Sequence, residues 1–143
     1  MQHLLLSDAA LIVDTALAKG RELNCHPLTV SVLDAGGHLL ALKREDCSGI
    51  LRPQIAQAKA WGALGMGHGG RNLAERAAAA PAFYAALTDI SGGRIAPVPG
   101  GVLIRNDAGD VLGAVGISGD HPDNDEACAV AAIAAAGLVS DCH

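Results

Sequence analysis

The spacing of apolar residues predicts a helix and then a β-hairpin in the first third of the chain. Over residues 9–17, apolar positions recur at helical spacing directly after Ser7 and Asp8, which are residue types that cap helices. Residues 28–33 predict the first strand. The turn sequence Asp34-Ala-Gly-Gly37 follows, and residues 38–44 predict the return strand of the hairpin.

The same arrangement returns near the C-terminal end. Residues 102–106 and 111–117 predict two strands joined by the turn sequence Asp107-Ala-Gly109. A short extended piece, residues 95–98, contains Pro97 and is followed by Pro99, so we expect it to serve only as an edge strand. The two hairpins therefore predict at least four antiparallel strands.

A helical region with an unusual concentration of glycine separates the two hairpins. Apolar spacing predicts helices over residues 50–64 and 72–80, and a further short turn of helix over 81–87. Five glycines lie between positions 62 and 70. Because this cluster follows a helix and lacks a Lys-Ser/Thr ending, it does not fit a phosphate-binding loop. Close helix packing, within the chain or between subunits, is favoured over the floor of a ligand site.

The stretch 113–126 combines a buried strand, a glycine-lined turn and the start of the last helix. Its glycines leave room for another group to approach the backbone. Acidic residues then gather where a helix presents free N–H groups, and a proline suits the first helical position. These residues are Asp120, Asp123, Asp125 and Glu126, with Pro122 among them. The acids either cap and solubilise the helix start or form a wall of a ligand pocket.

Composition narrows the class of protein. The chain has 143 residues, of which 50% are hydrophobic, and this size predicts a single domain over residues 1–143 with a buried core. A net charge of −5 and a single Trp, Tyr and Phe argue against a nucleic-acid partner. The apolar segments are too short for a membrane span, and the N-terminal residues lack the basic region of a signal peptide. We therefore expect a cytoplasmic protein.

The cysteines show no metal-binding spacing and are expected to be reduced thiols. We expect Cys25 and Cys128 to pack as small apolar residues, and Cys142 to belong to a frayed chain end.

Histidine and lysine side chains supply the first candidates for chemistry. His26, His38, His68 and His121 are expected in loops or at the edges of elements, where a neutral imidazole can bind iron or transfer a proton. A solvated loop histidine is the commoner role, and His121 stands out because it adjoins the acidic cluster. Lys59 lies in an otherwise apolar helical stretch, so its ammonium either reaches solvent or points into a pocket that lowers its pKa.

Arginine and serine side chains supply further candidates. Arg44 and Arg52 could together hold a carboxylate, although surface ion pairs explain them equally well. Ser118 is expected on a turn, but the residue two positions after it is Asp120 and not the glycine of a nucleophile elbow.

Several stretches of the chain resemble the GlcG/HbpS family, which also includes the C-terminal domain of the PduO adenosyltransferases. They are residues 32–44 (VLDAGGHLLALKR), 58–60 (AKA), 99–102 (PGGV) and 113–119 (GAVGISG), together with Asp125-Glu126. The resemblance covers nearly the whole chain. It implies a single α/β (α+β) domain of a profilin-like kind, in which an antiparallel five-stranded sheet is flanked by helices, and assembly into homo-oligomers, as dimers or larger. Some members bind haem, and one secreted member degrades haem and senses redox stress with a partner kinase.

The residues and the resemblance together give a candidate ligand site between the lysine helix and the turn 116–126. Its candidate ligand-binding residues are Arg44, Lys59, His68, Gly100, Gly101, Ser118, Gly119 and His121. Haem is the implied cofactor, with His68 and His121 as candidates for binding its iron, and we expect no other metal site.

The chain departs from the family pattern at three positions of the helical region. Relatives usually carry threonine where Gly62 stands, and a Pro-Thr pair where Gly69 and Gly70 stand. If those threonines contact haem in relatives, this chain lacks that contact, and His68 is the residue that could replace it.

Three hypotheses follow for the function. The first is a small-molecule binding protein with haem as ligand. The second is a catabolic enzyme that acts on a small organic acid or carbonyl compound, in which Lys59 and Asp125 or Glu126 transfer protons and Arg44 orients a carboxylate. The third is an accessory protein that contacts a partner, which the low aromatic content makes less attractive.

Overall fold

Residues 2–143 are described by a computed structural model with five helices and five strands. The elements are α1 (Leu6–Glu22), β1 (Thr29–Asp34), β2 (Leu39–Arg44), α2 (Arg52–Met66), α3 (Gly70–Ala79), α4 (Pro81–Ile90), β3 (Gly101–Arg105), β4 (Val111–Ser118), α5 (Pro122–Ala135) and β5 (Val139–Asp141). Both predicted hairpins are present, as β1–β2 and β3–β4. The α+β class and the five-stranded antiparallel sheet are confirmed.

The two hairpins join through their inner strands. The sheet has the order β2-β1-β4-β3-β5, and each neighbouring pair is antiparallel. The central pairing of β1 with β4 places Thr29 opposite Ser118 and Asp34 opposite Gly113. Because helices cover both faces, almost every residue of β1 and β4 is buried.

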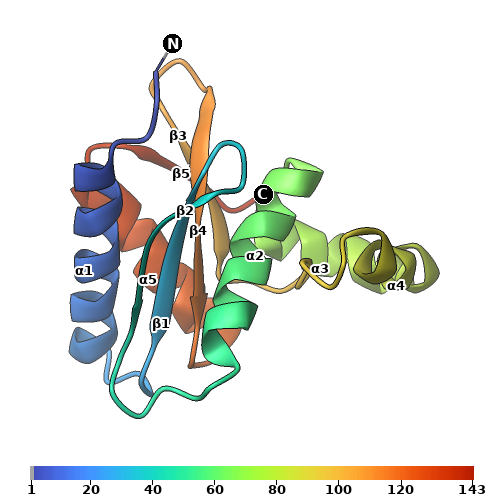
Figure 1. Ribbon diagram of the computed structural model, residues 1–143, viewed down its shortest axis with the longest axis horizontal. Coiled ribbons are helices and arrows are strands. Elements are labelled where there is room, and N and C mark those ends of the chain that lie inside the picture. Colours follow the sequence, from blue (N-terminus) through green and yellow to red (C-terminus); the bar gives the residue numbers. More distant parts are fainter. Residues whose placement is uncertain (1) are drawn as a thin grey trace.

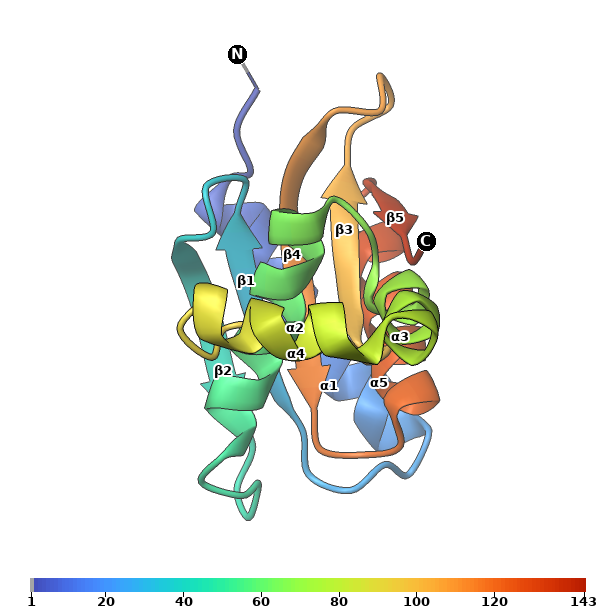
Figure 2. The ribbon, with the colours of Figure 1, turned by 90° about the vertical axis from the view of Figure 1, so that its right-hand side faces the viewer.

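The helices form a layer on each face of the sheet (Figure 1). On one face α1 and α5 pack against each other, and α2 lies alone on the other face. Residues that alternate along β1 divide between the two layers, since Val30 and Val32 face α1 and α5, whereas Leu33 faces α2. Helices α3 and α4 extend away from the sheet on the α2 side (Figure 1), and α4 crosses in front of α2 in Figure 2. Side chains of α3 and α4 form a small apolar cluster of their own.

Helix α2 lies unusually close to the sheet because glycines face it. A Cβ atom at Gly116 of β4 would collide with the carbonyl oxygen of Ala56, and a Cβ atom at Gly101 of β3 would collide with that of Lys59. The buried side of α2 is itself lined by small residues such as Ala60. The backbone of α2 therefore rests almost directly on β3 and β4, and its middle is fixed against the end of β4.

The fifth strand differs from the prediction. Residues 95–98 are not a strand, since Pro97 has no N–H to donate. The fifth strand is β5, which pairs with β3 through Leu103 opposite Asp141. The expectation of a frayed C-terminal end was therefore wrong. The main-chain N–H of Gly69 donates to the carbonyl oxygen of His143 at 3.2 Å, so the last residues contact the joint between α2 and α3.

The helix boundaries shift by a few residues from the predicted ones. Ser7 and Asp8 do not cap α1, which begins one residue before Ser7, and the residue at its N-cap, Leu5, forms no side-chain hydrogen bond. Helix α4 continues to Ile90, three residues beyond its predicted end. Within residues 2–143, none of the helices combines the length and the apolar character that crossing a bilayer requires.

Candidate functional site

The centre of the candidate site is a buried ion pair between α2 and α5. The Lys59 Nζ atom donates to Asp125 Oδ2 at 3.1 Å and to the carbonyl oxygen of Ile117 at 2.8 Å. Lys59 is 3% exposed and Asp125 is 1% exposed. The other carboxylate oxygen of Asp125 accepts the main-chain N–H of Asp120 at 3.1 Å. The lysine helix and the acidic corner are therefore in direct contact, and the lysine reaches neither solvent nor an open cavity.

Burial destabilises the charged forms of both Lys59 and Asp125. Desolvation lowers the pKa of Lys59, and nearby Arg52 lowers it further, whereas Asp125 acts in the opposite direction. Desolvation likewise raises the pKa of Asp125, against the opposing effect of Lys59. Each partner therefore depends on the other to remain charged in the interior.

A row of polar groups runs across the sheet beside this pair. Arg44, Thr29 and Ser118 are opposite one another on β2, β1 and β4. Thr29 Oγ1 and Ser48 Oγ lie 2.9 Å apart, and Arg52 Nη1 donates to Ser118 Oγ at 3.1 Å. Arg44 Nη1 donates to the carbonyl oxygen of Ser48 at 2.7 Å. We call Thr29, Arg44, Ser48, Arg52 and Ser118 the polar corner. Its buried hydroxyl groups join the start of α2 to the ends of the central strands.

The predicted glycines border the Lys59–Asp125 pair or the turn after β4. A Cβ atom at Gly100 would lie 2.9 Å from Lys59 Nζ, and Gly101 faces the backbone of Lys59. Gly119, between Ser118 and the acidic residues, has φ of 147° and lies against the carbonyl oxygen of Pro27. Close contacts within the chain therefore explain these glycines without a ligand.

His121 caps α5 at the edge of this region. Its Nδ1 atom accepts the main-chain N–H of Asp123 at 3.3 Å, and its side chain is 70% exposed. The proton of the neutral ring is then on Nε2. Asp123 Oδ2 lies 3.8 Å from the same Nδ1 atom. A shift of the proton to Nδ1 would therefore leave an acceptor nearby and free Nε2 to bind a metal.

The remaining acidic residues take separate roles. Glu126 and Asp123 both pair with Arg71 of α3, with Arg71 Nη2 at 3.0 Å from Glu126 Oε1 and at 2.6 Å from Asp123 Oδ1. Asp120 accepts the side-chain amide of Asn124 at 2.7 Å and the main-chain N–H of His26 at 3.1 Å. These hydrogen bonds lower the pKa of Asp120 to about 2. Asp125 alone of this cluster contacts Lys59.

His68 lies on the turn after α2, and no hydrogen bond of its ring is described. The neighbouring glycines are packed against backbone, since a Cβ atom at Gly69 would collide with Cys142 and one at Gly70 with the carbonyl oxygen of Val98. Packing within the chain accounts for this part of the glycine cluster. Cys128 is buried, as predicted, and desolvation raises its pKa to about 12, so its thiol stays protonated.

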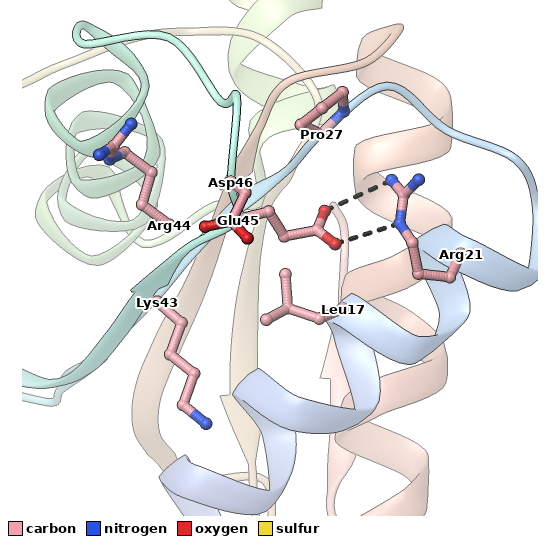
Figure 3. Close-up of a pocket in the computed structure, with 7 residues that line it drawn as sticks. All are labelled: Leu17, Arg21, Pro27, Lys43, Arg44, Glu45 and Asp46. Carbon is pink, nitrogen blue, oxygen red and sulfur yellow. Dashed lines mark hydrogen bonds and ion pairs between the residues drawn. The ribbon is translucent and has the colours of Figure 1, made fainter.

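The surface cavities lie away from the Lys59–Asp125 pair. Of the four described among residues 2–143, none is lined by Lys59 or Asp125. The first, of about 550 Å³, lies between α1 and β2 (Figure 3). There Glu45 faces Arg21, with Arg21 Nε at 3.1 Å from Glu45 Oε2, while Arg44 points to the opposite side. A second cavity, of about 390 Å³, lies beside Trp61. The pocket predicted between α2 and the turn after β4 is not among them and stays a prediction.

Residues 4–134 match the model of a family described as haem-degrading protein HbpS-like. The chain belongs to the HbpS-like family. This HbpS-like chain is also similar to solved structures. It shares 27% identity with PduOC in a crystal structure of its complex with haem, over 96% of this chain and 97% of that one, with a TM-score of 0.85.

Two further solved structures are similar to this HbpS-like chain. One is the Klebsiella pneumoniae protein ORFY, with 26% identity over 96% of this chain and 92% of that one, and a TM-score of 0.86. The other is HbpS, with 28% identity over 94% of this chain and 91% of that one, and a TM-score of 0.81. No curated protein sequence matches the chain significantly.

Two groups at the site were not singled out from the sequence. Thr29 and Ser31 occupy alternate positions of β1 among apolar residues, a pattern that puts hydroxyls on one face of a buried strand. Arg71 follows the glycine cluster, and its pairing with Asp123 and Glu126 depends on how α3 returns toward α5. The alternating hydroxyls of β1 could have been found in the sequence, whereas the pairing of Arg71 could be found only in the tertiary structure.

Proposed function

We propose that this HbpS-like chain is a small-molecule binding protein that takes haem. The observation that carries the proposal is its likeness to PduOC, which was crystallised with haem, across nearly the full length of both chains. The family description, haem-degrading protein HbpS-like, supports the same ligand class.

The chain offers side chains that fit the chemistry of haem. Haem presents a flat apolar macrocycle, two carboxylates and an iron that accepts an imidazole nitrogen. Arg52 and Arg44 of the polar corner supply guanidinium groups suited to carboxylates. Ile50 and Leu51, next to Arg52 in the sequence, are 92% and 62% exposed and supply apolar surface. His121 would supply its Nε2 atom after its proton moves to Nδ1, which lies 3.8 Å from Asp123 Oδ2. When bound, the iron would add redox chemistry that the side chains do not provide.

A hemin titration of the purified chain tests this proposal. We expect a Soret band that saturates at about one hemin per chain, and a shifted band with at least about tenfold weaker binding in His121→Asn. Asparagine is chosen because it can still cap α5, so the variant removes the imidazole and keeps the helix start. His68→Ala tests the second iron candidate in the same way, and His38→Ala, an exposed histidine at the β1–β2 turn, is the matched control.

The outcomes distinguish two questions: whether haem is the ligand, and which histidine binds its iron. If the wild-type chain gives no saturable Soret band, haem is not its ligand. If hemin binds but neither His121→Asn nor His68→Ala changes the band, the two histidines are not the iron ligands.

A catalytic role for Lys59 is a second candidate, and the lowered pKa of this lysine favours it. Its burial against Asp125 gives a substrate no contact with Nζ in this arrangement. If the amine of Lys59 titrates near its ordinary pKa of about 10.4 in solution, this candidate is removed.

A further inference from the structure

A cavity on the outer side of α2 is separate from the polar corner and from the Lys59–Asp125 pair. It measures about 390 Å³, which is within the range of small-molecule sites. Gln54, Gln57 and Trp61 of α2 form one wall, and the loop between α4 and β3 forms the other through Gly92, Gly93 and Arg94. No residue of the polar corner lines it.

Arg94 is held in place at this cavity without an acidic partner. Its Nε atom donates to the carbonyl oxygen of Ser91 at 2.7 Å, and its own main-chain N–H donates to Ser91 Oγ at 3.1 Å. The guanidinium carbon lies 4.1 Å from the centre of the Trp61 ring, a cation–π contact. Among residues 2–143, no carboxylate forms an ion pair with Arg94.

The terminal nitrogens of Arg94 distinguish it from Arg44 and Arg52, the two arginines of the polar corner, which also lack an ion pair. Arg44 and Arg52 each use Nη1 to bind a group of the polar corner, and Arg44 points away from the cavity that it borders (Figure 3). For Arg94, the described hydrogen bonds involve only Nε and the main chain. Its two terminal nitrogens, which form the fork that binds a carboxylate, are therefore uncommitted beside an open cavity.

The position of this loop depends on Gly62 of α2, which has no side chain. Gly62 faces Ile95, and a Cβ atom at Gly62 would lie 3.2 Å from Ile95 Cγ2. The main-chain N–H of Ala96 donates to the carbonyl oxygen of Ala58 at 3.4 Å. Without a side chain at position 62, the segment after Arg94 packs closely on α2. This contact places Arg94 over Trp61 and forms the second wall of the cavity.

The other lining groups can bind the rest of a polar ligand. Gln57 Nε2 donates to the carbonyl oxygen of Pro53 at 3.2 Å, which leaves its amide oxygen as an acceptor. No hydrogen bond of the Trp61 indole N–H is described, so this group remains as a donor. We propose that the cavity binds a small organic carboxylate, with its carboxylate on Arg94 and its body along Trp61 and the Gly92–Gly93 backbone.

Trp61 is the only tryptophan of the chain and lines this cavity, so tryptophan fluorescence reports on binding there. We would titrate the protein with benzoate and lactate, and with benzamide and lactamide as uncharged counterparts. The carboxylates are expected to change the fluorescence saturably, and the amides are not. In Arg94→Gln the dissociation constant for the carboxylates should rise at least about tenfold, whereas in Arg76→Gln, an exposed arginine of α3, it should not change. Because Arg94→Gln also alters the surroundings of Trp61, calorimetry provides a second measurement of the same constants.

Free acids and the propionates of haem share this chemistry, and a hemin titration of Arg94→Gln distinguishes them. Unchanged hemin affinity together with weakened benzoate or lactate binding assigns the cavity to a free organic acid. At least tenfold weaker hemin binding assigns the bound carboxylate to haem. The benzoate and lactate titrations do not depend on whether the wild-type chain binds hemin. If no carboxylate binds saturably, or if the wild-type chain and Arg94→Gln bind every carboxylate equally, the proposal is overturned.

Discussion

At the scale of single residues, the Lys59–Asp125 pair is the most constrained feature of the molecule. Both side chains are buried, and together they link α2, β4 and α5. A buried charge without its partner is far more costly than the pair, because water is absent to solvate it. The pair therefore specifies how the middle of α2 meets the start of α5 more than it adds net stability.

We expect each single substitution, Lys59→Met or Asp125→Leu, to lower the free energy of unfolding by about 3–5 kcal/mol, and the double variant to cost less than the sum. Urea unfolding measures all three. The exposed pair of Lys43 and Asp14 is the matched control, and Lys43→Met should cost less than about 1 kcal/mol. Additive losses in the double variant would show that the two buried groups do not depend on each other.

Asp120 makes the stability of the folded chain depend on pH in the acid range. Its hydrogen bonds with Asn124 and His26 lower its pKa from 3.8 to about 2 in the folded state. A lowered pKa adds stability that is fully present above the unfolded value and is lost as the pH falls through the folded value. We therefore expect the stability of the wild-type chain to fall more steeply than that of Asp120→Asn between about pH 4 and pH 2. Thermal unfolding across this range measures the slopes, with Asp107→Asn in the exposed β3–β4 turn as control. Equal slopes for the wild-type chain and Asp120→Asn would contradict the assignment.

At the scale of elements, the placement of α2 depends on the absence of side chains at the sheet. Gly116→Ala would push a methyl group into the carbonyl oxygen of Ala56. Because both colliding groups belong to regular elements, we expect a loss of about 1–3 kcal/mol or more in the free energy of unfolding. Gly65→Ala lies in α2 itself, where the new methyl group would meet Trp61 at an ordinary 3.5 Å, and we expect it to stabilise the chain by about 0.5–1 kcal/mol. A neutral Gly116→Ala would mean that α2 can move away from the sheet at little cost.

The elements with strong local signals were predictable from the sequence. Turn sequences fix both hairpins, and apolar spacing fixes the helices within a few residues. β5 was not predictable, because its three residues carry no pattern of their own and pair only where β3 presents a free edge. The same limit applies to the site. Asp125 and Glu126 are adjacent, and successive helical residues point about 100° apart, so the orientation of α5 decides which of them meets Lys59.

At the scale of the whole molecule, the helices α3 and α4 extend away from the sheet (Figure 1). Tyr84 and Leu87 turn inward to Leu73, whereas Phe83 and Ile90 on α4 are 54% and 75% exposed. The family resemblance implies homo-oligomers, and this exposed apolar surface is where we expect a second copy to bind. Light scattering of the wild-type chain and of a Phe83→Ser, Ile90→Ser variant measures the mass. A wild-type chain with the mass of a monomer at all concentrations would contradict the expectation.

The central pairing of β1 with β4 also determines how the protein can be divided. Residues before the α3–α4 extension supply one hairpin, residues after it supply the other, and neither contains the pairing that completes the sheet. A cut at the exposed Gly92–Gly93 link would leave two fragments that can still pair through β1 of one and β4 of the other. We therefore expect that two fragments divided at this link, when expressed separately, would reassemble on mixing.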